Sequence, residues 1–230
     1  MLRIQFVKGM GSPVDRPVPD ISVYGDGRVL TTAIDLAESP ARDVVKDHRL
    51  TRTAYRRLYR DARLAGLTTS RTFHSKEQTA DGGLTVVTFL ADRRQHASTV
   101  QAGAGGVRVW MINRLARRLR ALPRGDLLRP PVAYRPERMA IVAWRPAKDP
   151  SGDSPGSGTQ AAPWPLRPLP AGRSATCTLL TGADAEAAAR LAGSASTTAQ
   201  WRSGPGLYTV IFRPLLPDET DCAAIIPKSP

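Results

Sequence analysis

Alternating apolar and polar residues mark the first strands of the chain. Residues 2–7 alternate in this way, and strand-forming runs at residues 21–24 and 28–30 flank the triplet Gly25-Asp26-Gly27. Such a triplet supplies residues that accept positive φ, as tight hairpin turns require. The pattern therefore predicts a strand followed by a hairpin. Because the turn accounts for Asp26, we favour a structural role for this residue over metal ligation or acid catalysis.

A helical period replaces the alternation after residue 51. Thr51 suits the N-cap position, apolar residues recur at helical spacing through residues 52–65, and Gly66 stands at the C-terminal cap position. The predicted helix is amphipathic, because a basic stripe lies beside its apolar face. The apolar face comprises Ala54, Tyr55, Leu58, Tyr59 and Ala62, and the stripe comprises Arg52, Arg56, Arg60 and Arg63. We favour a solvated face for this stripe and keep an anion-binding face as the functional alternative.

A second hairpin and a second helix follow in the same order. Residues 84–90 and 95–100 read as strands joined by a turn at residues 91–94, and a helix is predicted over residues 107–121. The arginines Arg114, Arg117, Arg118 and Arg120 crowd the surface of this helix outside its apolar face. A further strand is predicted over residues 134–144.

These elements predict an α+β fold, in which antiparallel hairpins carry helices on one face. We expect a basic domain over residues 1–148 and a linker rich in Pro, Gly and Ser over residues 149–163. A smaller α+β unit is predicted over residues 164–230. In that unit Thr181 to Asp184 resembles a capping box, with Asp in place of Glu, at the start of an Ala-rich helix.

Charge is distributed unevenly along the 230 residues. Residues 1–148 hold 27 Lys or Arg against 13 Asp or Glu, whereas residues 149–230 hold 6 against 7. The chain is 41% hydrophobic, which is enough for a real core, and no apolar run reaches the 18 or so residues of a membrane-spanning helix. The basic excess indicates a nucleic acid, an anionic polymer or an acidic membrane as partner, or serves solubility alone.

Cys177 and Cys222 are the only cysteines and form a candidate disulfide. A bond between them indicates maturation in an oxidising compartment. The first nine residues do not resemble a signal peptide, because they lack an apolar stretch and a cleavage site. Two readings remain: a cytosolic chain with free thiols, or an extracytoplasmic chain whose export signal lies upstream of Met1.

Candidate catalytic motifs are weak. The run from Gly152 to Gly156, Gly-Asp-Ser-Pro-Gly, resembles the surroundings of a trypsin-type nucleophile. It falls in the predicted linker, whereas a nucleophilic serine needs a rigid scaffold that holds a base and an oxyanion hole. We therefore predict no catalytic residue.

Metal and phosphate motifs are also incomplete. None of His48, His74 and His96 has a second ligand at helical spacing, and the segment that holds His48 with Asp43 and Asp47 is predicted to be a polar loop. We predict no metal and no cofactor.

A glycine-rich run precedes the second predicted helix. Gly103 to Gly106 could present backbone N–H groups to an anion beside Arg108, but it fits neither common phosphate-binding pattern. A flexible lead into the helix is the favoured interpretation.

Short motifs are spread along the whole chain. They are Val23–Val29, Ala65–Leu67, Tyr134–Arg138, Trp164–Leu166, Leu180–Ala183, Trp201–Ser203, Leu207–Tyr208, and Arg213–Glu219 before Cys222. In this combination the chain resembles a family of uncharacterised secreted proteins and lipoproteins of high-GC bacteria. The resemblance implies that the region like residues 1–30 follows directly after an export signal, and that both cysteine positions recur. It implies no activity, ligand or catalytic residue.

Together these features predict a non-catalytic extracytoplasmic protein of the cell envelope. Its basic face would meet an anionic envelope polymer or a protein partner, with Arg52, Arg56, Arg60, Arg63, Arg114, Arg117 and Arg118 as contact candidates. A cytosolic protein that binds nucleic acid without sequence preference is the alternative. A hydrolase without a recognisable motif is the third hypothesis.

Overall fold

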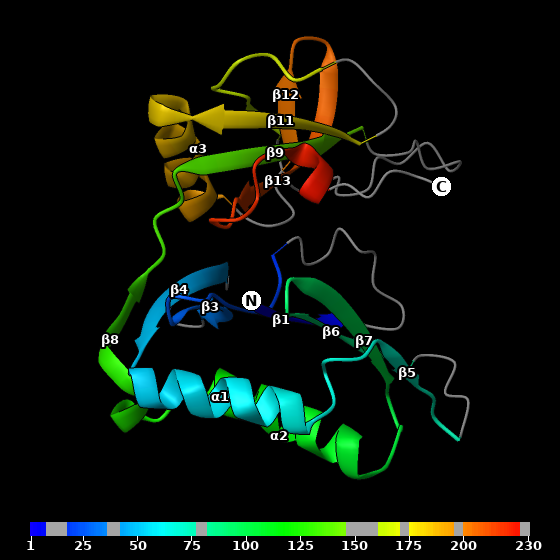
Figure 1. The fold of residues 1–230 in the computed structure, drawn as a ribbon. Helices are drawn as coiled ribbons and strands as arrows, with labels where there is room; N and C mark the ends of the chain where they lie inside the picture. Colours follow the sequence, from blue (N-terminus) through cyan, green and yellow to red (C-terminus); the bar gives the residue numbers. More distant parts are fainter. Residues whose placement is uncertain are drawn as a thin grey trace. The chain divides into compact units, whose positions relative to one another are not determined.

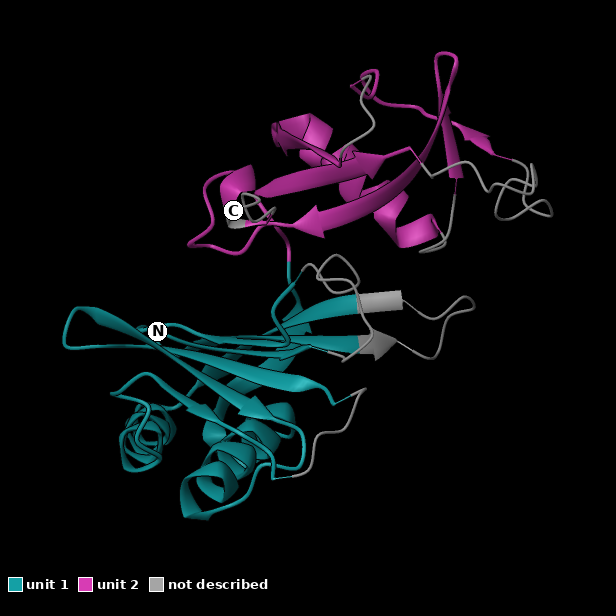
Figure 2. Cartoon of the chain, turned by 90° about the vertical axis from the view of Figure 1, so that its right-hand side faces the viewer, with its two compact units in different colours: residues 1–37, 43–134 teal, residues 38–42, 135–230 magenta. Residues whose placement is uncertain are grey.

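The computed structural model divides the chain into two compact units (Figure 2). Unit 1 comprises residues 1–37 and 43–134, and unit 2 comprises residues 38–42 and 135–230. The structure describes residues 1–7, 18–35, 42–76, 82–145, 161–170, 175–195 and 200–225. The predicted α+β class is confirmed, since the described helices accompany two mostly antiparallel sheets.

Unit 1 is built on an eight-stranded sheet in the order β5-β7-β6-β1-β2-β3-β4-β8 (Figure 1). Its strands are β1 (Leu2–Val7), β2 (Ile21–Val23), β3 (Arg28–Asp35), β4 (Arg42–Leu50), β5 (Arg71–Phe73), β6 (Leu84–Ala91), β7 (Arg94–Gln101) and β8 (Leu127–Ala133). Both predicted hairpins are present, β2 with β3 and β6 with β7. Strand β1 pairs with one strand of each and so joins the two hairpins into one sheet.

Helices α1 (Arg52–Leu64) and α2 (Val107–Arg120) lie side by side on one face of this sheet (Figures 1 and 2). Their apolar sides enter one core with the strands, through residues such as Leu58 and Leu115. The Thr51 hydroxyl accepts a hydrogen bond from the Ala54 N–H at 3.2 Å, which confirms the predicted N-cap.

The two hairpin turns reach their conformations by different routes. In the first turn Gly27 adopts φ 81°, as its sequence predicts. The second turn places Asp92 and Arg93 at φ 49° and 63° without any glycine. Two successive positive φ values match the primed turns that follow the twist of a hairpin. This turn type was not evident from the sequence.

The predicted polar loop around His48 is wrong, because this segment forms β4. The strand pairs with β8 and lies beside β3 in the sheet. Asp47 is buried and accepts hydrogen bonds from Arg28 Nε at 3.0 Å and Nη2 at 2.7 Å. The alternation of apolar and polar residues that marks a strand is missing here, because the buried position holds Asp47, paired with Arg28, instead of an apolar side chain.

Unit 2 contains a five-stranded sheet in the order β10-β12-β13-β9-β11. Its strands are β9 (Arg138–Trp144), β10 (Ala162–Pro163), β11 (Thr176–Thr181), β12 (Gln200–Ser203) and β13 (Gly206–Pro214). Strand β9 was expected in the first domain, but it lies between β13 and β11 in this second sheet. The compact units accordingly divide after residue 134, ahead of the predicted linker.

Helix α3 (Gly182–Ser194) packs Ala185 and Ala188 into the core of unit 2. The predicted capping box does not form, because the Thr181 side chain makes no capping hydrogen bond. Thr181 is the last residue of β11, and the chain turns from this strand directly into the helix.

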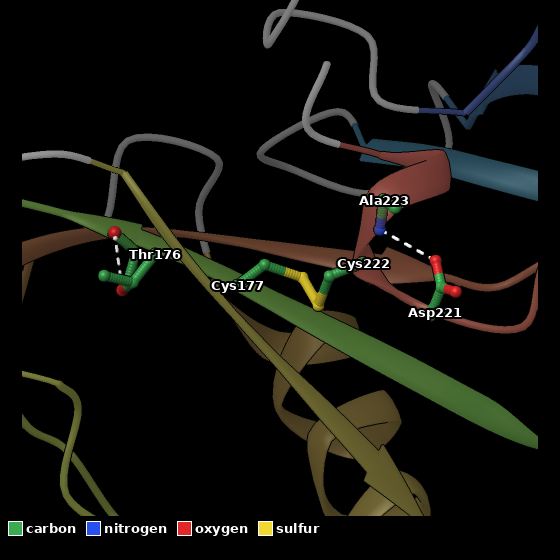
Figure 3. The surroundings of a disulfide bond; sticks show 6 residues. Thr176, Cys177, Asp221, Cys222 and Ala223 are labelled. Atoms are coloured by element: carbon green, nitrogen blue, oxygen red, sulfur yellow. Dashed lines mark hydrogen bonds between the residues drawn. A yellow bond between two sulfur atoms is a disulfide. The ribbon is translucent and has the colours of Figure 1, made fainter. Parts of the chain in front are cut away.

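A disulfide joins Cys177 in β11 to Cys222 at the start of the short helix η3 (Cys222–Ala224), as Figure 3 shows. The Cα atoms are 5.9 Å apart, and 45 residues separate the two cysteines in sequence. The N-terminal side of η3 is capped by Asp221, which accepts the Ala223 N–H at 2.8 Å. The predicted disulfide is thus present, and it fixes the C-terminal segment to an edge strand of the second sheet.

None of the described helices combines the length and apolar character that crossing a membrane would require.

Candidate anion-binding surface

Basic side chains are concentrated on helices α1 and α2. The two helices carry ten arginines and one acidic residue, Asp61. The predicted stripe Arg52, Arg56, Arg60 and Arg63 is exposed along the side of α1 that faces away from the core. Arg114 and Arg117 are exposed on α2 in the same way. We call these six residues the arginine face.

Arg118, also an expected anion contact, is engaged within unit 1. Its Nη2 donates to Asp126 at 2.8 Å, and Arg57 Nη2 donates to the other oxygen of this carboxylate at 2.5 Å. Asp126 ends the short helix η2 (Arg124–Asp126), so one carboxylate ties the segment after α2 to both helices. Hydrogen bonds from Arg118 and Arg57 hold the pKa of Asp126 below its usual range, although burial opposes them. Arg118 is therefore less available to a ligand than the six residues of the arginine face.

Arg60 and Arg63 are partly engaged. Arg60 Nε lies 4.0 Å from Asp61, and Arg63 Nη1 lies 3.5 Å from Asp92 and 3.5 Å from the Tyr59 hydroxyl. These are exposed contacts, which stabilise a fold little and exchange readily with a ligand. Both arginines keep charge available for an incoming anion.

Arg52, Arg56 and Arg117 are the least engaged members of the arginine face. Over the described ranges, no carboxylate lies within ion-pair distance of any of the three. The guanidinium of Arg114 stands 5.3 Å from the ring centre of Trp110, a cation–π contact between two exposed side chains of α2. The surface is suited to several phosphate or carboxylate groups of one extended anion, because the donors follow two neighbouring helices.

A cavity of about 800 Å³ opens beside the N-terminus of α2. It is lined by His74, Ser75, Lys76, Ala102, Gly103, Gly105 and Gly106. A Cβ on Gly103 would come within 2.8 Å of the Ser75 hydroxyl, so this glycine lets the segment after β5 close against the turn after β7. Gln101 holds the same segment by accepting the Ser75 N–H at 3.0 Å.

The glycine-rich run thus forms a defined wall of this cavity rather than only a lead into α2. The N-terminus of α2, which follows this run, has no side-chain cap, and the first turn of the helix contains no acidic residue. His74 and Lys76 are exposed, and no carboxylate is among the lining residues of this described pocket. The geometry does not assemble a buried base and a third group to orient it, which nucleophilic catalysis requires.

The histidine and aspartate candidates occupy structural positions. His48 Nε2 lies 2.9 Å from the Thr31 hydroxyl on the neighbouring strand, and burial lowers its pKa although Asp47 opposes this shift. Asp26 accepts the Arg28 N–H at 3.0 Å within the hairpin turn and Arg49 Nη1 at 2.7 Å. Among the described residues, no group of three or more His, Cys, Asp or Glu could hold a metal ion. The Asp43 side chain and the run from Gly152 to Gly156 lie outside the described residues.

Sequence reasoning missed three exposed apolar side chains beside the arginine face. Leu64 is 62% exposed, Val107 77% and Trp110 53%. The helical spacing from Trp110 to Arg114 and Arg117 places it on the outer side, and this signal was available.

Comparison with family models, curated proteins and solved structures gives no match for this chain. The resemblance to secreted proteins and lipoproteins therefore remains a prediction.

Proposed function

We propose that this chain is a non-catalytic extracytoplasmic protein of the bacterial cell envelope that binds an anionic polymer through its arginine face. The observation that carries the proposal is the pair of neighbouring helices with ten arginines and one acidic residue. Arg52, Arg56 and Arg117 supply charge that the described part of the fold does not neutralise. A repeating polyanion is the partner that uses many exposed, separately placed cations at once.

The disulfide between Cys177 and Cys222 supports the compartment in this proposal. Disulfides persist in oxidising surroundings and are rare in the cytosol of mesophiles. The alternative of a cytosolic protein bound to nucleic acid uses the same arginine face, so charge alone does not separate the two hypotheses. The cysteine state separates them.

Binding is tested by titrating the whole protein with poly(glycerol phosphate) at several salt concentrations. We expect affinity to fall steeply between about 50 and 200 mM salt, because each arginine contact releases counterions from the polymer. A duplex of DNA of similar charge serves as the comparison. Absence of binding to the polymer at the lowest salt would contradict the proposal, and a marked preference for the duplex would favour the nucleic-acid alternative.

The compartment is tested by the intact mass of protein isolated from its own cells. The sample is alkylated once without reduction and once after reduction. Two cysteines that react only after reduction support the extracytoplasmic assignment. Two thiols that react without reduction would remove it and favour the cytosolic alternative.

A further inference from the structure

We infer that the exposed apolar side chains beside the arginine face, Leu64, Val107 and Trp110, dock on an acidic lipid bilayer. This inference deepens the proposed function, because it rests on the same cationic surface and names a lipid headgroup as one of its anions. We call these three side chains the apolar end. Leu64 is 62% exposed, Val107 77% and Trp110 53%. Large exposed apolar side chains that lie together mark surfaces that meet a partner or a membrane.

The apolar end is formed by residues from both helices, the end of α1 and the start of α2. Val107 and Trp110 are three residues apart on α2, so they share one side of that helix. Leu64 is the last residue of α1, and the Arg108 side chain lies about 3.5 Å from the position that a Cβ on Gly66 would take. The C-terminus of α1 therefore lies beside the N-terminus of α2, as Figure 1 shows.

Leu64 also points toward α2. It follows Asp61 by three residues and so lies on the same side of α1. Asp61 faces α2, because its carboxylate lies 3.9 Å from Arg118 Nη1. Leu64 is thus directed to the seam between the helices, where Val107 begins α2.

Cations surround the apolar end. Arg114 follows Trp110 by one helical turn and stacks near its ring, while Arg63 and Arg108 neighbour Leu64 and Val107 along the chain. Asp61, the one acidic residue of the two helices, and Asp92 of the hairpin turn already face Arg118 and Arg63. Charge complementarity therefore favours an acidic surface over a neutral or basic one.

The combination of side chains favours a bilayer over a soluble anion. Tryptophan concentrates at the boundary between headgroups and acyl chains, with arginine reaching the phosphates beside it. A helix pair with an apolar end inside a basic surface can lie in that boundary without crossing the bilayer. A soluble polyanion would use the arginines and leave Leu64, Val107 and Trp110 in water.

The test uses vesicles of phosphatidylcholine with about one third phosphatidylglycerol, and pure phosphatidylcholine vesicles, with the whole chain. We expect binding to the acidic vesicles only, reduced about tenfold in the Val107→Ser/Trp110→Ser variant. The Leu128→Ser/Val132→Ser variant is the matched control, because these side chains are 68% and 47% exposed on β8. It should bind like the natural sequence.

Binding of each protein to soluble poly(glycerol phosphate) separates this inference from the proposed function. Equal polymer binding by both double variants, with vesicle binding reduced about tenfold only in Val107→Ser/Trp110→Ser, supports the docked apolar end. Polymer binding without vesicle binding, or vesicle binding that survives this variant, overturns the inference and leaves the proposed function standing. Binding to neither overturns both.

A second readout reports insertion directly. Brominated phosphatidylcholine in the acidic vesicles should quench the tryptophan fluorescence of the natural sequence. The Trp110→Phe variant keeps an apolar side chain and should lose this quenching. Quenching that persists in Trp110→Phe would show that another tryptophan meets the lipid and would contradict the inference.

Discussion

Unit 1 and unit 2 are both α+β, but they are stabilised by different means. Among the described residues, 22 hydrophobic side chains are buried in unit 1 and 14 in unit 2. Unit 2 adds a disulfide and a buried ion pair between Arg213 and Glu219. A small core gains much from a covalent cross-link, whereas a larger one folds without it and can carry an unneutralised charged surface. Unit 2 therefore holds the cross-link and the fully buried ion pair, and unit 1 holds the unneutralised charge on which the proposed binding rests.

The largest expected effect comes from the buried ion pair of unit 2. Arg213 is 1% exposed, and Glu219 accepts its Nη2 at 2.8 Å and the Leu216 N–H at 2.8 Å. Glu219→Ala leaves the guanidinium buried without its carboxylate, so we expect a loss of about 3–5 kcal/mol in the free energy of unfolding. Urea denaturation measures the loss, and hydrogen exchange locates it. Faster exchange in β6 and β7 rather than in β9 and β13 would contradict the assignment.

Removal of the disulfide is expected to cost nearly as much. The bond between Cys177 and Cys222 closes a loop with a sequence separation of 45, and its loss by double substitution to alanine should destabilise unit 2 by about 3–4 kcal/mol. Thermal unfolding of the natural sequence with and without reductant compares the stability of the disulfide-bonded and the reduced protein. Unchanged stability after reduction would show that the core of unit 2 does not depend on the cross-link.

A moderate effect is expected in unit 1 from Asp126. Asp126→Asn removes the charge that holds Arg57 and Arg118, and these arginines are partly exposed, so we expect a loss of about 1–2 kcal/mol. Because the folded-state pKa of Asp126 is lowered, its contribution is present above pH 4 and disappears as the pH falls below its ordinary value of about 3.9. The free energies of unfolding of the natural sequence and of Asp126→Asn, measured by urea denaturation, should become equal at low pH. A constant difference across this range would contradict the ion-pair interpretation.

The smallest effect concerns His48. Its folded-state pKa lies below the ordinary value of about 6.5, so the unfolded chain binds a proton that the folded chain does not. The free energy of unfolding should therefore decrease as the pH falls below 6.5. The decrease should weaken in His48→Asn and persist in His74→Asn, a substitution at an exposed position. Identical pH profiles for His48→Asn and the natural sequence would exclude this role.

Periodicity predicted much of the fold, because each main hairpin and helix has its own local pattern. The strands that it missed depend on distant partners. Asp47 is buried in β4 only because Arg28 pairs with it from β3, and Pro130 and Pro131 interrupt the pattern of β8, an edge strand that tolerates proline. Strand β9 was recognised, but its apolar run does not reveal which sheet it joins.

The candidate surface was partly predictable for the same reason. The spacing of Arg52, Arg56, Arg60 and Arg63 predicts a shared helix side from local sequence alone. The engagement of Arg118 and Arg57 by one carboxylate was not predictable, because Asp126 is 8 residues from Arg118 in sequence but 69 from Arg57. Exposed Trp110 could have been assigned from its spacing to Arg114.

The most direct test of the account compares two triple variants in poly(glycerol phosphate) binding. Arg52→Gln/Arg56→Gln/Arg117→Gln changes the arginine face of unit 1, and Arg135→Gln/Arg190→Gln/Arg202→Gln removes the same charge from exposed positions in unit 2. The account predicts that the slope of log affinity against log salt, which is negative, becomes about 2 less steep in the first variant and stays unchanged in the second. Equal slopes for the two variants would show that net charge, rather than the arginine face, governs binding.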